Sequence, residues 1–586
     1  MSYSADIFCI LGIISGVSLH TLLYRYGDWD TKSPTLVLAY LLVMLTGTIG
    51  LQYSSSAQNL WKGSLADIWR SFVYHLLGVY GSMLIYRAFF HRLVQFPGPF
   101  LACLSNFYIT RLAAKKLLLH EEIHDLHAQF GDYVRLGKTD LFHYPPAQLI
   151  IHSSLLIGPR ELSITDPAAV TAIYGTRSET TKGPWYTVLD PRTPMSFTRD
   201  KIEHAARRKI WDQSFNTKSL DAYEPLVTKC AQQLIDVIDQ RLDKSIEMST
   251  WVRYYAFEVM ANLAFGKPFN MLTEQTESYF LKVMREDMKL VGYLRHLPWL
   301  STLLMRTPVI NQNNKKFWRW IEGQFSERIE KGPQHPDIFG SMLDAYMQGP
   351  RSKYDTLKLH GDGYLIVIAG RYDYSILLFY LFFFLQKALD NTLISDTTSS
   401  TITHLLFYLA RDLELSTKLQ QELGKLPRLH DRDLMSIELL DAVIFETLRL
   451  HPATPAGLSR VTSKNGLMVN DTYIPHDIVV TVPLYTLFRD ERSFDHPHEF
   501  IPERWTESPE LVKDRSVFIP FLIGPNACVG KRLAMMEIRR IVAELLRWYD
   551  ISLAPDQTEE SFIRGKVDTF TLSAAPLFLN FTKRGN

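Results

Sequence analysis

The segment Phe521–Gly530 constrains the fold of this chain more than any other, because it presents one cysteine on a short loop that contains glycine. Cys528 stands just before a run from Lys531 whose apolar spacing predicts a helix. The free N–H groups and the dipole at the start of a helix favour the thiolate form of a cysteine. Gly524 and Gly530 allow a tight turn and a close approach to a flat partner. The alternative is a structural cysteine buried beside the helix.

A thiolate on such a loop can be the axial ligand of a haem iron, where its electron donation favours cleavage of an O–O bond. The spacing Phe-x-x-Gly-x-x-x-Cys-x-Gly resembles the haem-binding signature of the cytochrome P450 family. The resemblance implies that heme b is the cofactor and that Cys528 binds its iron. The family usually has Arg or His two residues before the cysteine. This chain has Asn526 there, which can form hydrogen bonds but carries no charge.

Two further motifs of the family lie upstream in the expected order. Glu446 and Arg449, three residues apart on a predicted helix, share one face and can pair. Arg504 follows in the segment Phe500–Trp505. In the family this arginine joins the pair in a buried charge network that supports the cysteine loop, and buried charges need such partners. The resemblance therefore gives Glu446, Arg449 and Arg504 a structural role.

Three basic residues are candidates for holding the haem propionates. His204 and Arg208 are spaced i,i+4, so they lie on one side of a predicted helix. They resemble the family's propionate-binding helix, although a basic, solvent-exposed helix face is the alternative. Arg460, which follows the helix of Glu446, is a similar candidate. Because Asn526 is uncharged, haem retention should depend more on these three cations.

The oxygen-activation motif of the family, Ala/Gly-Gly-x-Asp/Glu-Thr-Thr/Ser in mid-helix, is present here in two halves. The first half ends at Gly370 and the second begins at Ser395, and removing residues 371–394 joins them without a gap. The resemblance makes Asp396 and Thr397 the catalytic pair that steers protons and holds ordered water at bound dioxygen. With the intervening segment present, the two halves need not share one helix.

A second interruption lies between Gly137 and Pro159, where removing residues 138–158 restores another pattern common in the family, Val-Arg-x-Gly-Pro-x-Glu-Leu-Ser. Both segments can be encoded so that they begin with the splice donor GT and end with AG. We therefore interpret residues 138–158 and 371–394 as translated retained introns, which come from a gene-model error or an unspliced transcript. The alternative is a pair of genuine insertions.

Three apolar stretches precede residue 96, and each is near the length that spans a bilayer: Ile7–Tyr24, Leu36–Leu51 and Phe72–Phe90. The second is short and can lie at the membrane interface, so we expect two to three transmembrane helices within residues 1–95. Basic residues after the third stretch place the following domain in the cytosol by the positive-inside rule. The resemblance to membrane-bound members of the family implies the endoplasmic reticulum membrane, with a multi-pass or N-terminally anchored chain.

The expected architecture is a membrane region, residues 1–95, followed by one haem-thiolate monooxygenase domain, residues 96–586. The resemblance implies the cytochrome P450 fold, a mainly α-helical haem-binding domain with small β-sheets. Apolar spacing predicts helices over 200–265, 280–330, 400–425 and 531–548, and strands around Met468–Val482. The segment Lys182–Tyr186 falls in the loop region over the family's pocket, where it either contacts substrate or serves packing alone.

Charge and cysteine content exclude several classes of protein. The formal net charge of +1 gives no indication of a nucleic-acid partner. The cysteines show neither the spacing of paired metal ligands nor a disulfide framework, which fits a domain facing the cytosol. They are Cys9, Cys103, Cys230 and Cys528.

The resemblance implies a monooxygenase that inserts one oxygen atom from O2 into a small hydrophobic substrate in fungal secondary metabolism. The chain contains no recognisable flavin or NADPH domain, so the expected electron donor is a separate NADPH-dependent reductase. One alternative is a haem-thiolate isomerase or lyase without O2 chemistry, although the intact Ser-Asp-Thr-Thr half argues against it. Another is an inactive, unspliced isoform. The substrate itself is not encoded in any motif.

Overall fold

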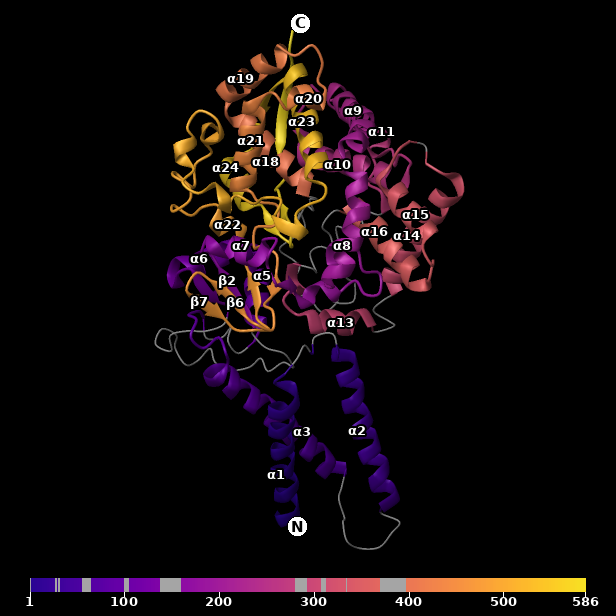
Figure 1. Cartoon of the computed structure of the whole chain (residues 1–586), viewed down its shortest axis with the longest axis vertical. Coiled ribbons are helices and arrows are strands. Elements are labelled where there is room, and N and C mark those ends of the chain that lie inside the picture. Colours follow the sequence, from indigo (N-terminus) through magenta and orange to yellow (C-terminus); the bar gives the residue numbers. More distant parts are fainter. Residues whose placement is uncertain are drawn as a thin grey trace.

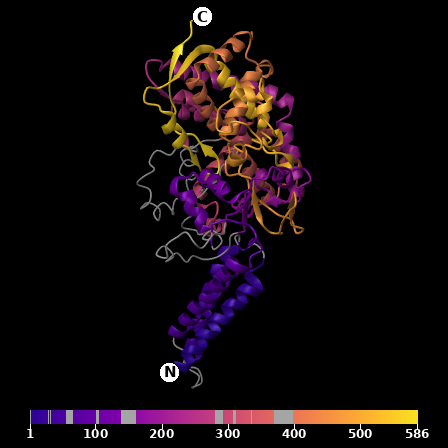
Figure 2. The ribbon, with the colours of Figure 1, turned by 90° about the vertical axis from the view of Figure 1, so that its left-hand side faces the viewer.

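The computed structural model describes residues 2–26, 29, 32–54, 65–99, 105–136, 160–279, 292–306, 312–333, 335–368 and 397–585. The chain forms a large, mainly helical body, and three N-terminal helices project from one end of it (Figures 1 and 2). The C-terminus lies at the opposite end of the body (Figure 1).

The projecting helices are α1 (Ser2–Leu19), α2 (Ser33–Ser54) and α3 (Leu65–Ile85). Each of α1 and α3 continues into a π-helical turn, η1 (His20–Tyr24) and η3 (Tyr86–Phe90) respectively. Two apolar spans, Asp6–Tyr24 and Ser33–Gly50, are long enough to cross a membrane. Among the described helices α3 does not meet this criterion, although it covers most of the third predicted stretch.

Glycines bring α1 and α3 into close backbone contact. A Cβ atom added to Gly16 would lie 2.1 Å from the carbonyl oxygen of His75, and one added to Gly78 would lie 2.4 Å from that of Ile13. Small residues at the interface of two helices allow this approach, because van der Waals packing then extends along both backbones. The helices α1 and α3 therefore form one packed pair.

The projecting helices also contact the body. Helix α2 lies against α13 (Pro298–Arg306), and the buried hydroxyl of Ser33 donates to the carbonyl oxygen of Trp299 at 2.7 Å. A buried polar contact of this kind holds two elements in a defined position. The N-terminal helices are therefore connected to the body by packing as well as by the chain.

The body is built mainly from α-helices. In the first half of the chain these are α5 (Phe107–Lys116), α6 (Leu119–Phe130), α7 (Ala168–Tyr174), α8 (Lys201–Ser214), α9 (Thr217–Asp239), α10 (Met248–Phe265) and α11 (Met271–Glu274). After α13 they are α14 (Gln312–Lys331), α15 (Ile338–Gln348), α16 (Lys353–Ile368), α18 (Thr397–Arg411), α19 (Leu413–Gly424), α20 (Asp431–Leu434), α21 (Glu438–Leu450), α22 (Leu484–Leu487), α23 (Lys531–Trp548) and α24 (Glu559–Arg564).

The core of the body forms around α10 and α18. Nearly every residue of α10 is buried, as expected for a helix that is apolar on all sides and packs against α9, α16 and α18. Helix α18 is buried from Ser399 to Ala410. Helix α23 is strongly amphipathic, and its apolar face packs on α9, α18 and α19. The cysteine loop is thus attached to a helix that is fixed in the core.

Short strands form four small sheets. The largest has the order β1-β2-β8-β5-β3, and β4-β12-β9, β6-β7 and β10-β11 form the others. The first eight strands are β1 (Tyr133–Arg135), β2 (Glu161–Ile164), β3 (Thr181–Lys182), β4 (Ile246–Glu247), β5 (Arg460–Val461), β6 (Leu467–Val469), β7 (Thr472–Ile474) and β8 (Val479–Thr481). The last four are β9 (Tyr549–Leu553), β10 (Val567–Asp568), β11 (Leu572–Ser573) and β12 (Phe578–Lys583).

The expected fold class is confirmed: the body is mainly helical with small sheets. The predicted helical regions 200–265, 400–425 and 531–548 contain α8 to α10, α18 with α19, and α23. The described part of 280–330 contains α13 and α14, and β6, β7 and β8 fall in or beside the predicted strand region.

Candidate active site

Short backbone contacts fold the cysteine loop. The N–H group of Cys528 donates to the carbonyl oxygen of Phe521 at 2.9 Å. Gly524 has a φ of 69°, and a Cβ atom there would lie 2.3 Å from the carbonyl oxygen of Tyr174. Because an L side chain is disfavoured by this backbone conformation and has no space, only glycine fits the position. The loop leads into α23, whose N-cap residue is Gly530.

Cys528 faces the main cavity of the body. The cavity measures about 290 Å³, compared with about 80 Å³ for a second one beside β2. Cys528 lies deep in the fold, yet its side chain is exposed, because it opens onto this internal cavity. Burial raises the pKa of the Cys528 thiol above its ordinary value, and the N–H groups of Gly530 and Lys531 and the guanidinium of Arg208 offset this rise only in part. A metal ion bound to the sulfur would favour the thiolate outright.

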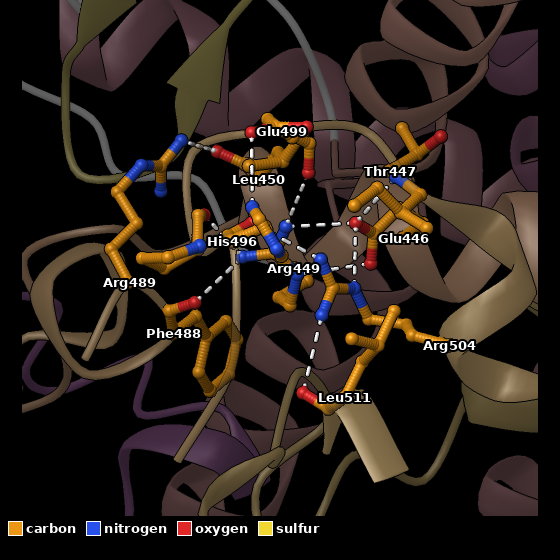
Figure 3. A network of polar contacts seen from close by, with 12 residues as sticks. Glu446, Thr447, Arg449, Leu450, Phe488, Arg489, His496, Glu499, Arg504 and Leu511 are labelled. Atoms are coloured by element: carbon orange, nitrogen blue, oxygen red, sulfur yellow. Dashed lines mark hydrogen bonds and ion pairs between the residues drawn. The ribbon is translucent and has the colours of Figure 1, made fainter. Parts of the chain in front are cut away.

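The three motif residues behind the loop form one buried charge network (Figure 3). Arg449 makes two contacts with Glu446, Nε to Oε2 at 2.9 Å and Nη2 to Oε1 at 2.8 Å. Arg504 Nε donates to Glu446 Oε1 at 3.0 Å. None of the three side chains is accessible to solvent. The structure therefore brings Glu446, Arg449 and Arg504 together, as the motifs predict.

Backbone carbonyl groups complete this network. The remaining N–H groups of Arg449 donate to the carbonyl oxygens of Phe488, Pro497 and Glu499 at 2.6–2.9 Å. Arg504 likewise donates to carbonyl oxygens of residues 495, 496 and 511. Buried guanidinium groups require such acceptors, because each unpaired N–H would cost desolvation energy. The two arginines therefore tie α21 to the irregular chain at residues 488–511.

A chain of aromatic residues connects the network to the cysteine loop. The indole N–H of Trp505 donates to Glu446 Oε2 at 3.0 Å. The ring of Trp505 packs on Phe518, with 4.4 Å between ring centroids. Phe518 is three residues before Phe521, where the loop begins. The network thus extends through Trp505 to the segment that leads into the loop.

The predicted propionate ligands border the same cavity as Cys528. His204 and Arg208 of α8 and Arg460 of β5 all line it. Arg208 donates to the carbonyl oxygen of Ala527 at 2.6 Å and also pairs with Asp212 at 2.7 Å. Burial and the neighbouring cations lower the pKa of His204 to about 4. The wall beside the cysteine loop therefore carries positive charge that anions would stabilise.

Described residues on both sides of the split motif, before Ala369 and from Thr397 onward, border the same cavity. Thr397, the first residue of α18, lines it together with Thr398 and Thr401. From α16 the cavity wall receives Leu365, Ile366 and Val367. Asp396 lies outside the described residues, as do the suspected insertions 138–158 and 371–394.

One further basic residue, Lys182, lines the cavity, and no sequence motif indicates it. Lys182 of β3 lines the cavity and is only 5% exposed. The sequence places the segment Lys182–Tyr186 over the pocket, but its local pattern does not predict a buried amine. Arg460, the nearest strand neighbour of Lys182, is far along the chain, so no spacing rule connects the two.

Comparison with known proteins identifies the family. The cytochrome P450 family model matches residues 155–350 and 395–581. This chain belongs to the cytochrome P450 family. It is 53% identical over 515 residues to cytochrome P450 monooxygenase orf5 of Eupenicillium brefeldianum, covering 88% of this chain and 96% of the relative. It is 38% identical over 586 residues to cytochrome P450 monooxygenase FCK2 of Fusarium pseudograminearum (strain CS3096), covering 99% and 97% respectively.

A third P450 relative is named by its reaction. Tryprostatin B 6-hydroxylase of Aspergillus fumigatus is 30% identical over 547 residues, covering 92% of this chain and 89% of the relative. These relatives are named as monooxygenases or as a hydroxylase, rather than as isomerases or lyases. The expectation of a P450 monooxygenase is therefore confirmed, and the family implies a haem-thiolate cofactor and a redox partner.

The residues of this chain fit a haem with thiolate ligation. The Cys528 sulfur is open to an internal cavity whose described walls are largely apolar. The basic side chains of His204, Arg208, Arg460 and Lys182 line that cavity, where the carboxylates of a porphyrin would accept hydrogen bonds from them.

Proposed function

We propose that this P450 inserts one atom of O2 into a small hydrophobic substrate at a b-type haem whose iron is bound by Cys528. The observation that carries the proposal is the position of the Cys528 sulfur, deep in the fold and open to the main cavity. When bound, the haem supplies the activation of dioxygen. The chain's own residues hold the cofactor, exclude water and move protons.

His204, Arg208 and Arg460 are the proposed propionate ligands, because all three line the cavity that Cys528 faces. Charge-assisted hydrogen bonds from such cations to carboxylates are short and strong. Glu446, Arg449 and Arg504 are proposed to act as a support for the loop. Helix α21 contributes Leu448 to the described cavity wall but neither Glu446 nor Arg449, which supports a structural role.

Asp396 and Thr397 are the proposed proton-handling pair. The position of Thr397 in the cavity wall supports its part in this proposal. A hydroxyl group there can hold a water molecule and move its proton within the cavity, and the carboxyl group of Asp396 would exchange protons with solvent. The bound haem would supply the oxygen chemistry, which consumes protons that these residues would deliver.

The walls of the cavity support a hydrophobic substrate. Apolar residues from several elements line it, among them Trp211 of α8, Met260 of α10, and Leu365 and Val367 of α16. Electrons are proposed to come from a separate NADPH-dependent reductase, as in the family. The name of the Aspergillus relative, tryprostatin B 6-hydroxylase, supports hydroxylation in fungal secondary metabolism as the setting.

We also propose that the active form lacks residues 138–158. Strands β1 and β2 pair antiparallel up to Arg135 and Leu162, and the N–H group of Leu136 donates to the carbonyl oxygen of Glu161 at 3.2 Å. Without the segment, only Gly137, Pro159 and Arg160 would connect the paired residues. A connection of three residues is a common length for a β-hairpin.

The same proposal applies to residues 371–394. Counted without them, Thr397 and Thr401 stand seven and eleven positions after Ile366. Positions with this spacing share one face of an α-helix, and all three residues line the same cavity. The family model also leaves residues 351–394 unmatched. One continuous helix from Lys353 to Arg411 would follow from the removal.

The reduced, carbon-monoxide-bound difference spectrum tests both proposals. It would be recorded on microsomes that express the full chain, a form without residues 138–158 and 371–394, and the Cys528→Ser variant of that form. We expect the red-shifted thiolate–haem band in the shortened form alone. The band in Cys528→Ser, or its absence from both parent forms, would overturn the assignment of Cys528. The band in the full chain would show that the segments are tolerated, against the intron proposal.

The N-terminal helices are proposed to anchor the enzyme in the endoplasmic reticulum membrane with its body in the cytosol. Two spans of sufficient length and hydropathy support an anchor. Basic residues between α3 and α6, including Arg87, Arg92 and Arg111, support a cytosolic body.

A further inference from the structure

Helix α3 packs in parallel along α1 through polar contacts. The hydroxyl group of Ser71 donates to the carbonyl oxygen of Phe8 at 3.2 Å. Further along both helices, Ser82 Oγ lies 2.8 Å from His20 Nδ1. Polar groups inside a bilayer require such partners, because lipid tails offer none. The proposed membrane anchor is thus a bundle that includes α3 as well as the two apolar spans.

Helix α2 lies beside this pair (Figure 1) but packs on it less closely, and a groove remains between the three helices. The groove measures about 640 Å³. Its α2 wall consists of Ala39, Tyr40, Val43, Met44 and Gly47. Residues 39, 43 and 47 follow one another at intervals of four, so they form one row on the helix surface. Because these side chains are short or absent, the row is a flat apolar strip.

A chain of hydrogen bonds crosses the groove. Ser15 donates to the carbonyl oxygen of Gly12 at 2.8 Å, so the Ser15 oxygen accepts from His75 Nδ1, 2.8 Å away. His75 Nε2 is then an acceptor, and the hydroxyl group of Tyr40 donates to it at 3.3 Å. Tyr24 in turn donates to the Tyr40 oxygen at 3.2 Å. The four side chains of this chain come from all three helices and all line the groove.

The hydrogen-bond chain has one open end, at Tyr24. Every hydroxyl hydrogen in the chain is used, and no described residue donates to the phenolic oxygen of Tyr24. The lone pairs of that oxygen are therefore available to a donor from outside the protein. Tyr24 is the last residue of its span, and Arg25 follows it. This position corresponds to the membrane–water interface, where tyrosine is typical.

The open end and the charge of the groove select among amphiphiles. Because the Tyr24 oxygen accepts a hydrogen bond, the ligand must donate one. Phosphodiester and carboxylate groups are ionised and only accept. Among the described lining residues Asp67 alone is charged, and it pairs with Arg70 at 3.3 Å, so no lining cation would offset a ligand's negative charge. An uncharged hydroxyl group meets both conditions.

We propose that the groove between α1, α2 and α3 binds a sterol-like amphiphile, a flat uncharged hydrocarbon with one hydroxyl group. The hydroxyl group donates to Tyr24, and the ring system lies along Ala39, Val43 and Gly47. A rigid ring system suits a flat strip, because it loses less conformational freedom on binding than an acyl chain. Since α2 also contacts the body through Ser33, an occupied groove would fix the body against the membrane. This inference rests on the proposed membrane anchor.

The test is photo-crosslinking of the full chain in microsomes, with labelled peptides identified by mass spectrometry. One probe is a cholestanol with a diazirine in its ring system, and the other is a phosphatidylcholine with a diazirine in an acyl chain. Gly47→Leu fills the groove, because a Cβ atom at Gly47 lies in ordinary contact with Ile68 at 3.6 Å. Gly50→Leu is its control, since no atom lies within 4 Å of that added Cβ atom. Tyr24→Phe removes the open acceptor, and the exposed Tyr26→Phe is its control.

In the parent, the sterol probe should label peptides of α1 and α2, and excess unlabelled cholestanol should compete with it. Gly47→Leu should abolish this labelling. Tyr24→Phe should weaken the apparent affinity for cholestanol about fivefold, which is the effect of one lost hydrogen bond. Neither control should change the labelling. The phosphatidylcholine probe should label the parent and all variants to the same extent.

Absence of sterol labelling in the parent, or equal labelling of the parent and Gly47→Leu, would contradict the proposal. So would phosphatidylcholine labelling that Gly47→Leu removes, because the groove would then hold an acyl chain. If Gly47→Leu is not recovered in the membrane pellet, the affinity of Tyr24→Phe decides, and an unchanged value would overturn the site. Release of the parent from the membrane by sodium carbonate would instead show that the proposed anchor has failed.

Discussion

At the scale of single residues, Glu446 is the acceptor on which the charge network depends. Its carboxylate accepts hydrogen bonds from Arg449, Arg504, the indole of Trp505 and the backbone N–H group of Ile501. A carboxylate offers about four lone-pair positions, so both oxygens are fully used. Among the described residues, Glu446 is the only carboxylate within ion-pair distance of either arginine.

Replacing Glu446 by Gln should therefore destabilise the protein by about 3–5 kcal/mol, because two buried guanidinium groups lose their counter-charge. Thermal unfolding and haem content of the purified enzyme would measure the effect. Glu438→Gln is the control, since Glu438 is exposed on the same helix. Equal stability of the parent and Glu446→Gln would contradict a supporting role for the network.

Single residues also show what the sequence can predict. The spacing of Glu446 and Arg449 predicts their pairing, because residues three apart on a helix are neighbours. The carbonyl acceptors of Arg449 could not be predicted, since they lie on irregular chain 39 to 50 residues later. The burial of Lys182 could not be predicted from the sequence either, because β3 pairs with the distant strand β5.

At the scale of elements, the turn between Phe521 and α23 is more constrained than its length suggests. Gly524 combines a φ of 69° with a carbonyl oxygen from α7 only 2.3 Å from the place a Cβ atom would take. The carbonyl oxygen belongs to Tyr174, the last residue of α7. The C-terminal end of helix α7 therefore limits how the backbone of the loop can be positioned at Gly524.

Gly524→Ala should displace the loop and lower the haem content of the purified protein. The left-handed conformation alone costs an alanine about 1–2 kcal/mol, and the contact with Tyr174 adds to it. Haem-to-protein absorbance ratios and melting temperatures would measure both effects. Gly424→Ala is the control, because no atom lies within 4 Å of the added Cβ. An unchanged haem ratio in Gly524→Ala would show that the loop tolerates movement.

The predicted elements agree best with the structure where apolar periodicity is long. Helices α9 and α23 fall within predicted regions because their buried faces repeat every three to four residues. The sheet order β1-β2-β8-β5-β3 could not be predicted in this way. Its strands are two to four residues long and come from positions up to 348 residues apart, between Tyr133 and Thr481.

At the scale of the whole molecule, the N-terminal helices place the body at one end of a narrow stalk (Figure 2). The large apolar side chains of α1 and α2 are mostly exposed, among them Ile10, Leu11, Leu41 and Val43. An exposed apolar surface of this extent is stable only in contact with lipid or a partner. The contact of Ser33 with Trp299 then holds the body close to that surface.

The full chain should remain in the membrane pellet after extraction with sodium carbonate, because its apolar spans insert into the bilayer. A form without residues 1–95 should be released into the supernatant. Immunoblots of both fractions would measure the distribution. Release of the full chain by carbonate would exclude a membrane-spanning anchor. Retention of the shortened form would show that the body itself binds the membrane.

The buried guanidinium of Arg460 in the cavity wall has a consequence for the life of the protein in the cell. Arg460 has no carboxylate within ion-pair distance among the described residues, so the newly made polypeptide carries an uncompensated buried charge until haem arrives. A ligand that binds only the folded chain raises its stability by mass action. The amount of intact enzyme would then follow the cell's haem supply, and chains made in excess of that supply would be degraded.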